Sequence, residues 1–186
     1  MKTGFGRFLA AALLVSAGVM GAATRESAAL PGNDADLAKQ VRHEIVMYPY
    51  YSIWDDIRFR VANGQVELMG AVNQPFKKAD LQRIVQHVPG VTAVTNDVKV
   101  LPLSSFDDRL RLQVARAIYR DPVLSRYALQ AVGPIHIIVD NGHVTLTGVV
   151  STDMEKNVAG IRASGAGLSF GAVTNNLQVE NPSKKS

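Results

Sequence analysis

The chain contains the stretch Val61-Ala62-Asn63-Gly64-Gln65-Val66-Glu67-Leu68-Met69-Gly70-Ala71-Val72, which returns 78 residues later, without a gap, as Val139-Asp140-Asn141-Gly142-His143-Val144-Thr145-Leu146-Thr147-Gly148-Val149-Val150. In both copies apolar residues recur at alternate positions on either side of an Asn-Gly pair. Alternation is typical of a half-buried strand, and Asn-Gly supplies the positive φ angles of a tight hairpin turn. The repeat therefore predicts two β-hairpins in two similar modules.

The similarity extends on both sides of the hairpin. Downstream, Val94–Val100 returns as Val173–Val179, at an offset of 79. Upstream, an apolar face with a spacing of four residues occurs twice at an offset of 73, as Leu37, Val41 and Ile45 and as Leu110, Val114 and Ile118. Such a spacing predicts a helix with one narrow buried face. The changes of offset belong in loops, where insertions cost little.

A second helix follows each hairpin. In the first module we expect Asn73 to cap it and Pro89-Gly90 to end it, with an apolar face formed by Leu81, Ile84, Val85 and Val88. In the second module Thr152 and Glu155 have the spacing of a capping box, and the expected apolar face is Met154, Val158 and Ile161. A glycine inside a strand, as at Gly70 and Gly148, indicates a bulge or a close approach of a helix to the sheet.

Together these elements predict an α+β fold with two tandem αββαβ modules. In each, two helices pack on one face of a three-stranded mixed sheet, because both helices need an apolar partner and the sheet offers one apolar face. The modules are expected at residues 34–102 and 106–180. A flexible leader (24–33) and a flexible tail (181–186) would flank them.

Residues 1–23 have the features of a secretory signal peptide. Lys2 and Arg7 precede an apolar run, Phe8–Met20, and small residues follow. The run is too short for a typical membrane span, although an uncleaved signal anchor is the alternative. Cleavage after Ala23 or Ala29 would release the chain into the periplasm or the medium. Because the chain has 0 cysteines, it can carry neither a lipoprotein anchor nor a disulfide.

The positive charge of the chain argues little for a nucleic-acid partner. The formal charge is +4, from 20 Lys and Arg against 16 Asp and Glu. Two of the 20 cationic residues, Lys2 and Arg7, lie in the predicted signal peptide. Half of the excess is therefore removable, and export takes the chain away from nucleic acid.

The paired hairpins, the flanking helices and the final V-x-N-x-(L/V)-x-V strand resemble the BON domain. The resemblance covers roughly residues 36–101 and 108–180. The second module departs from the pattern at its glycine-rich segment, Ala163–Phe170. Two such domains behind a signal peptide are similar to osmotic-stress-induced periplasmic proteins. The resemblance implies a non-enzymatic protein that binds phospholipid or supports envelope integrity, without catalytic residues to carry over.

The residues themselves give no sign of catalysis, a metal or a cofactor. The histidines (His43, His87, His136 and His143) fall on different elements, and His136 and His143 correspond to Arg58 and Gln65 in the first module, as expected of solvated surface. The paired carboxylates sit at element boundaries, where helix dipoles explain two of the three pairs. A catalytic serine motif and a phosphate-binding glycine loop are both missing from the sequence.

Two groups of residues are candidates for contact with a lipid or a protein partner. The aromatic loop (Tyr48–Trp54) contains Tyr50, Tyr51 and Trp54, and such side chains favour a membrane interface. The alternative for this loop is packing on the first core or between the modules. The second group is basic: Lys77 and Lys78 on the second helix, and Arg116 and Arg120 on the third. A solvated helix face is the alternative for these.

Two hypotheses of function follow. The first is an exported binding module that makes peripheral contact with anionic phospholipid or an envelope protein. The second is a protein-interaction or chaperone-like module that holds polypeptide on its sheets or between the modules. The oligomeric state is not set by the sequence. What the two copies share is scaffold, so function is expected where they differ: the aromatic loop, the helix surfaces and the segment Ser125–Pro134.

Overall fold

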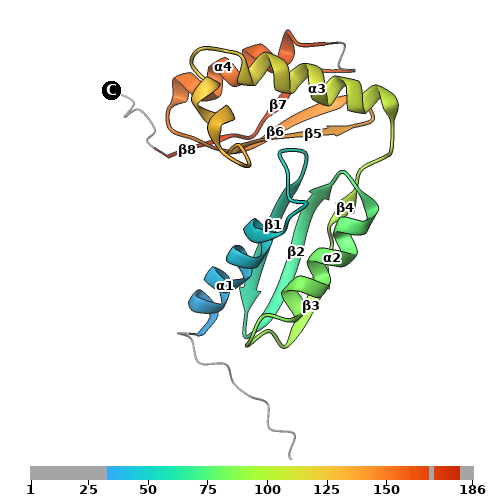
Figure 1. Cartoon of the computed structure of the whole chain (residues 1–186), viewed down its shortest axis with the longest axis vertical. Coiled ribbons are helices and arrows are strands. Elements are labelled where there is room, and N and C mark those ends of the chain that lie inside the picture. Colours follow the sequence, from blue (N-terminus) through green and yellow to red (C-terminus); the bar gives the residue numbers. More distant parts are fainter. Residues whose placement is uncertain (1–32, 168–169, 181–186) are drawn as a thin grey trace, which may run out of the picture.

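A computed structural model of the chain describes residues 33–167 and 170–180. The predicted signal peptide, the leader up to residue 32 and the tail lie outside the described residues. The described part forms two modules, stacked along the long axis of the molecule (Figure 1). The first contains α1 (Asn33–Met47), β1 (Asp56–Ala62), β2 (Gln65–Val72), α2 (Pro75–Gln86), β3 (Ala93–Asn96) and β4 (Lys99–Val100). The second contains α3 (Ser105–Tyr119), a 3-10 helix η1 (Ser125–Leu129), β5 (Ile135–Asp140), β6 (His143–Val150), α4 (Asp153–Ser164), β7 (Thr174–Asn175) and β8 (Gln178–Val179).

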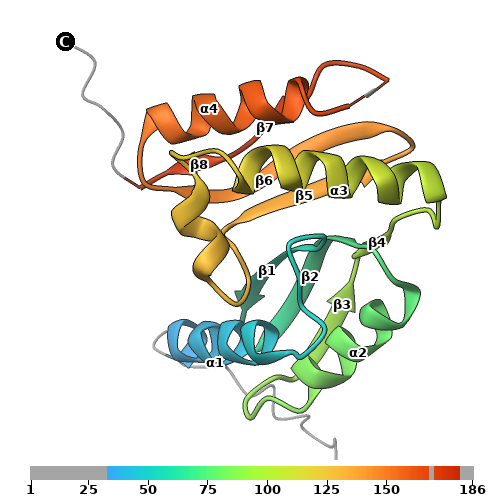
Figure 2. The same cartoon turned by 45° about the horizontal axis from the view of Figure 1, so that its top comes forward.

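Each sheet is mixed, with the second hairpin strand in its centre. β1 runs antiparallel to β2, while β3 and β4 both run parallel to β2 on its other side. The two short strands are therefore consecutive pieces of one interrupted third strand. The second module repeats this arrangement with β5, β6, β7 and β8. The α+β fold and the two helices over one face of each sheet are confirmed (Figure 2).

The Asn-Gly turns have the predicted positive φ angles, at 52° and 75° for Asn63 and Gly64 and at 51° and 78° for Asn141 and Gly142. An acidic residue in the first turn of each module's first helix holds the turn. The Asp107 carboxylate accepts the N–H groups of Asn141 and Gly142 at 3.0 and 2.8 Å. In the first module Asp34 does the same for its hairpin, at 2.7 and 3.0 Å. These carboxylates do more than complement a helix dipole, because they join the first helix to the hairpin.

The strand glycines admit the backbone of the preceding strand. Gly70 and Gly148 have φ angles of 112° and 110°, in the region that favours glycine. A Cβ atom at either position would lie 1.9 Å from a carbonyl oxygen, that of Asp56 or of Pro134. The close approach expected here is therefore made by a neighbouring strand rather than by a helix.

Each module has its own core, and the predicted faces of α1, α2 and α3 point into it. Leu37, Val41 and Ile45 are buried, as are their counterparts in the second module. On α2, Leu81, Val85 and Val88 are buried, and Ile84 packs partly against the core. The helix begins after Gln74 rather than Asn73, whose N–H donates instead to the Asp55 carboxylate at 3.1 Å.

The predicted face of α4 is wrong except at Val158, which is half-buried and packs against the core. Met154 and Ile161 are 67% and 68% exposed, and the buried positions are Glu155, Ala159 and Ala163. These correspond to Lys77, Leu81 and Val85 of α2, so both helices have the same orientation. The sequence pattern does not indicate this face, because alanine side chains are small and only weakly apolar. The capping box of Thr152 and Glu155 is confirmed.

The strand glycines give a test of the fold. We expect Gly148→Ala to lower the free energy of unfolding by about 3 kcal/mol, because it combines an unfavourable φ with a clash against backbone. Gly165→Ala is the control, since Gly165, the C-cap of α4, has a φ of −87° and room for a Cβ, with the Ile161 oxygen at 3.6 Å. Denaturant unfolding measures both. Equal losses in the two variants would contradict the backbone clash.

Candidate functional site

A basic pocket lies where the C-terminal ends of α3 and α4 meet. Its volume is about 640 Å³, and Arg116, Arg120 and Arg162 are among its lining residues. All three guanidinium-bearing residues are exposed. Pro122 and Ile161 add apolar surface between them. We call this feature the arginine pocket. It includes two of the basic residues singled out in the sequence, and the third comes from a helix more than 40 positions away.

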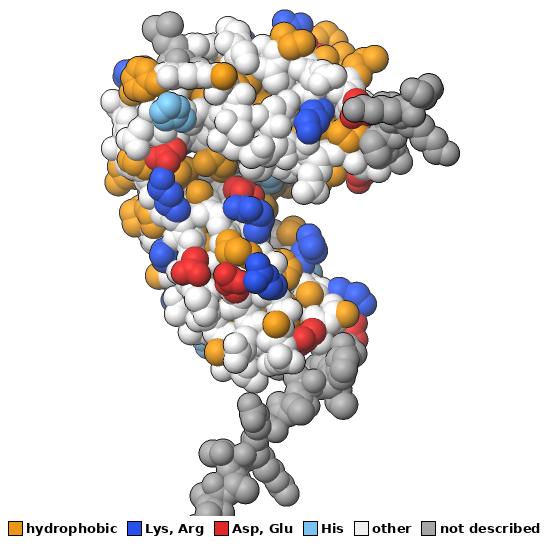
Figure 3. All heavy atoms as spheres, turned by 180° about the vertical axis from the view of Figure 1, so that it is seen from behind, with side chains coloured by type: hydrophobic (Ala, Val, Ile, Leu, Met, Phe, Trp, Pro, Cys, Tyr) orange, Lys and Arg blue, Asp and Glu red, His pale blue; other side chains and the backbone are white. Residues whose placement is uncertain are grey.

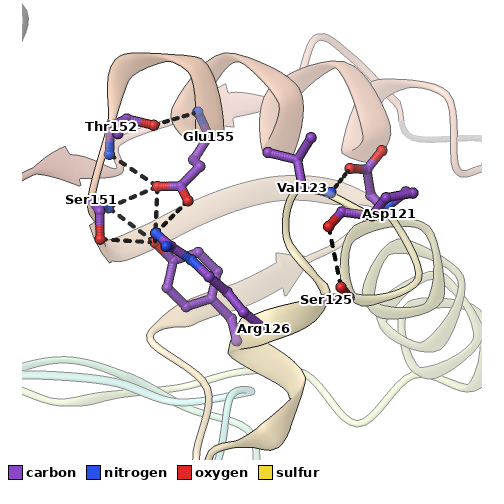
Figure 4. Close-up of polar contacts among 9 residues, drawn as sticks. Asp121, Val123, Ser125, Arg126, Ser151, Thr152 and Glu155 are labelled. Atoms are coloured by element: carbon purple, nitrogen blue, oxygen red, sulfur yellow. Dashed lines mark hydrogen bonds and ion pairs between the residues drawn. The ribbon is translucent and has the colours of Figure 1, made fainter.

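The charges of the arginine pocket are only partly compensated. Arg162 Nε donates to Asp121 Oδ2 at 2.6 Å. The buried Asp121 also accepts the Val123 N–H at 2.8 Å, and this bond, together with Arg162, lowers the pKa of the carboxyl (Figure 4). Among the described residues, no side-chain hydrogen bond or ion pair engages Arg116 or Arg120. The pocket therefore carries a local excess of positive charge.

Helix ends account for the position of these arginines in the chain. Arg116 lies in the last turn of α3 and Arg162 in that of α4, and Arg120 is the C-cap of α3. Cations are favoured at the negative ends of helix dipoles. Because α3 and α4 pack side by side, two such ends converge on one surface (Figure 2). An arrangement of this kind can bind a phosphate or carboxylate group by paired N–H donors.

Most of the aromatic loop is used between the modules. Ile53 accepts the N–H of Ile137 on β5 at 2.7 Å, so the loop lies along the edge of the second sheet. Trp54 packs against the second module's core. The ring of Tyr51 lies 5.5 Å from that of His136, and burial raises the pKa of Tyr51 to about 12. These contacts agree with the alternative weighed for the loop, packing between modules, and leave little of Tyr51 and Trp54 for a ligand.

Tyr50 differs from its neighbours because it remains exposed. Its ring makes an edge-to-face contact with Phe76, with a centroid separation of 5.4 Å, and a second such contact with the buried Tyr48. Phe76 is itself exposed at the start of α2. The pair forms a small aromatic patch on the first module, separate from the arginine pocket. Sequence reasoning identified Tyr50 but not Phe76.

Lys77 is buried, although the sequence made it a candidate for contact with a partner, with a solvated helix face as the alternative. It is only 5% exposed, and its Nζ donates to Asp55 Oδ2 at 2.6 Å. Asp55 also accepts the N–H of Ser52 at 3.0 Å. A carboxylate in the preceding loop therefore fixes the start of α2, and it draws the lysine inward. Lys78 is half-buried on the same helix, and its side chain shows no ion pair with a described residue.

The second module carries the same arrangement with its charges reversed. Glu155 corresponds to Lys77, and its partner is Arg126 of η1 (Figure 4). Glu155 also accepts the hydroxyl of Tyr127 and the N–H groups of Ser151 and Thr152, each at 3.0 Å. These buried carboxylates have an ample set of partners and serve the fold.

The back of the molecule gives no basic face comparable to the arginine pocket. Over the first module, the lower one in the view, Lys and Arg side chains alternate with Asp and Glu (Figure 3). On β1, Arg58 and Arg60 are themselves paired with Asp56 and Glu67, both at 3.4 Å. Within residues 33–167 and 170–180, none of the helices has the length and hydropathy needed to cross a membrane.

The BON domain model matches this chain twice, at residues 33–102 and 107–181. Among solved structures, the chain is similar to CdsD, a structural protein of the type III secretion system of Chlamydia trachomatis. The identity is 18%, with a TM-score of 0.31, and the match covers 78% of this chain and 61% of that one. The C-terminal domain of CdsD matches with 16% identity and a TM-score of 0.28, covering 78% and 98%. No curated protein matches the chain.

His136 makes the contact between the modules sensitive to pH. The sequence suggested a solvated residue, but His136 is half-buried beneath Tyr51, and this burial lowers its pKa despite the nearby Asp55 and Asp56. The pKa of His136 is lower in the folded state than in the unfolded state. Its contribution to stability is therefore fully present above the unfolded-state pKa, ~6.5, and is lost as the pH falls through the folded-state pKa. We expect the melting temperature to fall more on mild acidification in the wild type than in His136→Gln. Parallel pH profiles would contradict a role for this histidine.

Proposed function

The chain belongs to the BON domain family, and we propose that it is an exported, non-enzymatic module of the cell envelope that docks on anionic phospholipid. The family supports an envelope-associated role without catalysis. The signal peptide predicted from the sequence supports a periplasmic location. The arginine pocket supplies the chemistry for the ligand, and it is the observation that carries the proposal.

The arginine pocket suits a phosphate group at a membrane surface. Guanidinium groups bind phosphate oxygens through paired N–H donors and are weakly hydrated, so they give up water at low cost. Ile161 stands exposed among the arginines, and Met154 is exposed further along the same helix. Apolar side chains beside cations can enter the headgroup layer while the cations hold the phosphates. The outer surface of α3 and α4 would then face the bilayer.

The energies predict a weak, reversible contact. A basic residue near an anionic membrane contributes ~1 kcal/mol, and salt screens that contribution. Arg162 contributes less than the others because Asp121 already neutralises part of its charge. A peripheral attachment that responds to ionic strength fits a role in osmotic stress, in which the salt concentration around the envelope changes.

A protein-interaction or chaperone-like role is the second candidate. The exposed pair Tyr50 and Phe76 favours it, because aromatic side chains are common anchors of protein contacts. Replacing Tyr50 and Phe76 with serine tests this candidate with little risk to the fold. Loss of partner capture with lipid binding intact would favour it over the phospholipid.

Vesicle binding tests the first candidate. We expect the chain to co-sediment with phosphatidylglycerol-containing vesicles at low salt, and to do so far less at high salt or with purely zwitterionic vesicles. Arg116→Gln combined with Arg120→Gln should reduce partitioning by about thirtyfold, from ~1 kcal/mol for each arginine.

Arg58→Gln combined with Arg60→Gln removes the same charge from β1, far from the pocket, and serves as the control. We expect the control to bind almost as well as the wild type. Absence of binding at low salt would refute the proposal, and an equal loss in both double variants would reduce it to a general effect of net charge.

A further inference from the structure

The outer edge of the second sheet has its exposed backbone groups engaged by three different elements. β5 is the edge strand, and the backbone N–H and C=O groups of Ile135, Ile137 and Val139 point away from β6, while their side chains are buried in the core. The Ile135 carbonyl accepts the hydroxyl of Tyr119 at 2.7 Å. The Ile137 N–H donates to Ile53 at 2.7 Å, and the Val139 carbonyl accepts Arg111 Nη2 at 2.7 Å. This edge is closed to further strand pairing.

The corresponding edge of the first sheet is open. By the repeat, Ile57, Phe59 and Val61 of β1 occupy the same positions, paired to β2 in the same register. Within residues 33–167 and 170–180, no hydrogen bond reaches the outward carbonyls of Ile57 and Val61 or the outward N–H of Phe59. The reason is in the sequence of α1, where Ala38 replaces Arg111 and Val46 replaces Tyr119. Neither replacement has a side-chain donor.

A groove runs beside this open edge. It has a volume of about 440 Å³ between α1 and β1, and its apolar lining comes from Ala35, Ala38, Phe59 and Val61. The guanidinium of Arg42 lies 5.6 Å from the centre of the Phe59 ring. An unpaired strand edge beside an apolar groove is a template for the addition of another strand.

The second module also has a segment at the end of η1 that corresponds to the docked part of the aromatic loop. At the offset of the hairpin, residues 129–132 match residues 51–54, so Leu129 replaces Tyr51 and Ala131 replaces Ile53. Leu129 is 89% exposed, and Gln130 and Ala131 are exposed as well. The segment is uncharged. The chain therefore has two copies of the edge and two of the segment. One edge and one segment are joined to each other, and among the described residues the other two make no such backbone contact.

We propose that a second copy of this chain docks residues 129–132 on the β1 edge, repeating the contact that already joins the two modules. The carbonyl of Ala131 accepts the N–H of Phe59, as that of Ile53 accepts Ile137. A contact between two different surfaces of the same molecule is heterologous, so it extends head to tail instead of closing as a symmetric dimer. The inference does not depend on the binding of phospholipid.

The contact between copies is weaker than the one within the chain. Gln178 and Ala62 replace the ion pair of Lys99 with Asp140. Leu129 and Arg58 replace the ring contact of Tyr51 with His136. Val132 is also smaller than Trp54. The contact within the chain is helped by the high effective concentration of linked modules. Self-association is accordingly expected to be reversible and to depend on concentration.

Introducing an arginine into α1 at the position equivalent to Arg111 tests the proposal. Ala38→Arg places at the β1 edge the donor that Arg111 supplies at β5. We expect it to weaken self-association by about tenfold, or ~1.4 kcal/mol. Gln40→Arg adds the same charge on another face of α1 and should leave self-association unchanged. Sedimentation velocity over a wide concentration range measures all three proteins.

A cysteine pair locates the contact. The wild type has 0 cysteines, so Leu129→Cys and Arg58→Cys can be made in separate chains and mixed under mild oxidation. We expect the mixed disulfide dimer to exceed the two symmetric dimers well beyond the statistical ratio. A wild type that stays monomeric at every concentration, an Ala38→Arg variant that associates as the wild type does, or a statistical mixture of disulfides would each overturn the proposal.

Discussion

The outward N–H and C=O groups of a strand at the edge of a sheet need hydrogen-bond partners, and this constraint organises the molecule. At β5 the solution needs a tyrosine, an arginine and the backbone of the other module. The backbone contact at Ile53 brings the aromatic loop to the edge, and Trp54 and Tyr51 then bury apolar surface around it. The modules are therefore held by a backbone hydrogen bond and the ion pair of Lys99 with Asp140 around an apolar contact, rather than by the short linker alone. The same constraint, left unmet at β1, explains why the first module has a surface that its copy lacks.

The repeat made most of the fold predictable from the sequence. Hairpin turns, strand register and the buried faces of α1, α2 and α3 follow from local patterns of apolar residues and turn residues, each seen twice. The face of α4 did not follow, because its buried positions are Glu155, Ala159 and Ala163. Alanine carries little hydrophobic signal, and the buried glutamate has partners in two segments, of which only the fold brings Arg126 and Tyr127 to it. At the offset of the hairpin these three positions correspond to Lys77, Leu81 and Val85 of α2. The repeat itself therefore indicates which face of α4 is buried.

The candidate site could be predicted only in part, because a pocket depends on convergence. Arg116 and Arg120 share one helix end, and their spacing of four residues puts them on one face. Arg162 joins them from another helix, and no spacing within the sequence indicates this. Lys77 shows the opposite error: it appears exposed by pattern, yet Asp55 lies beneath it and pairs with it inside the protein. A charged residue near a helix start can serve a neighbouring loop as readily as the solvent, and composition does not distinguish the two.

The reversed ion pairs show what the duplication left free to change. The third position of the second helix must meet a charged partner from the preceding segment, whether as Lys77 with Asp55 or as Glu155 with Arg126. In the buried pair of Lys77 and Asp55, removing one member leaves a buried charge without its partner, which costs several kcal/mol, so these two members must change together. Arg116, Arg120 and Leu129 have no comparable partner among the described residues and could diverge one at a time. Surfaces of this kind can acquire a function in one copy while the scaffold stays the same in both.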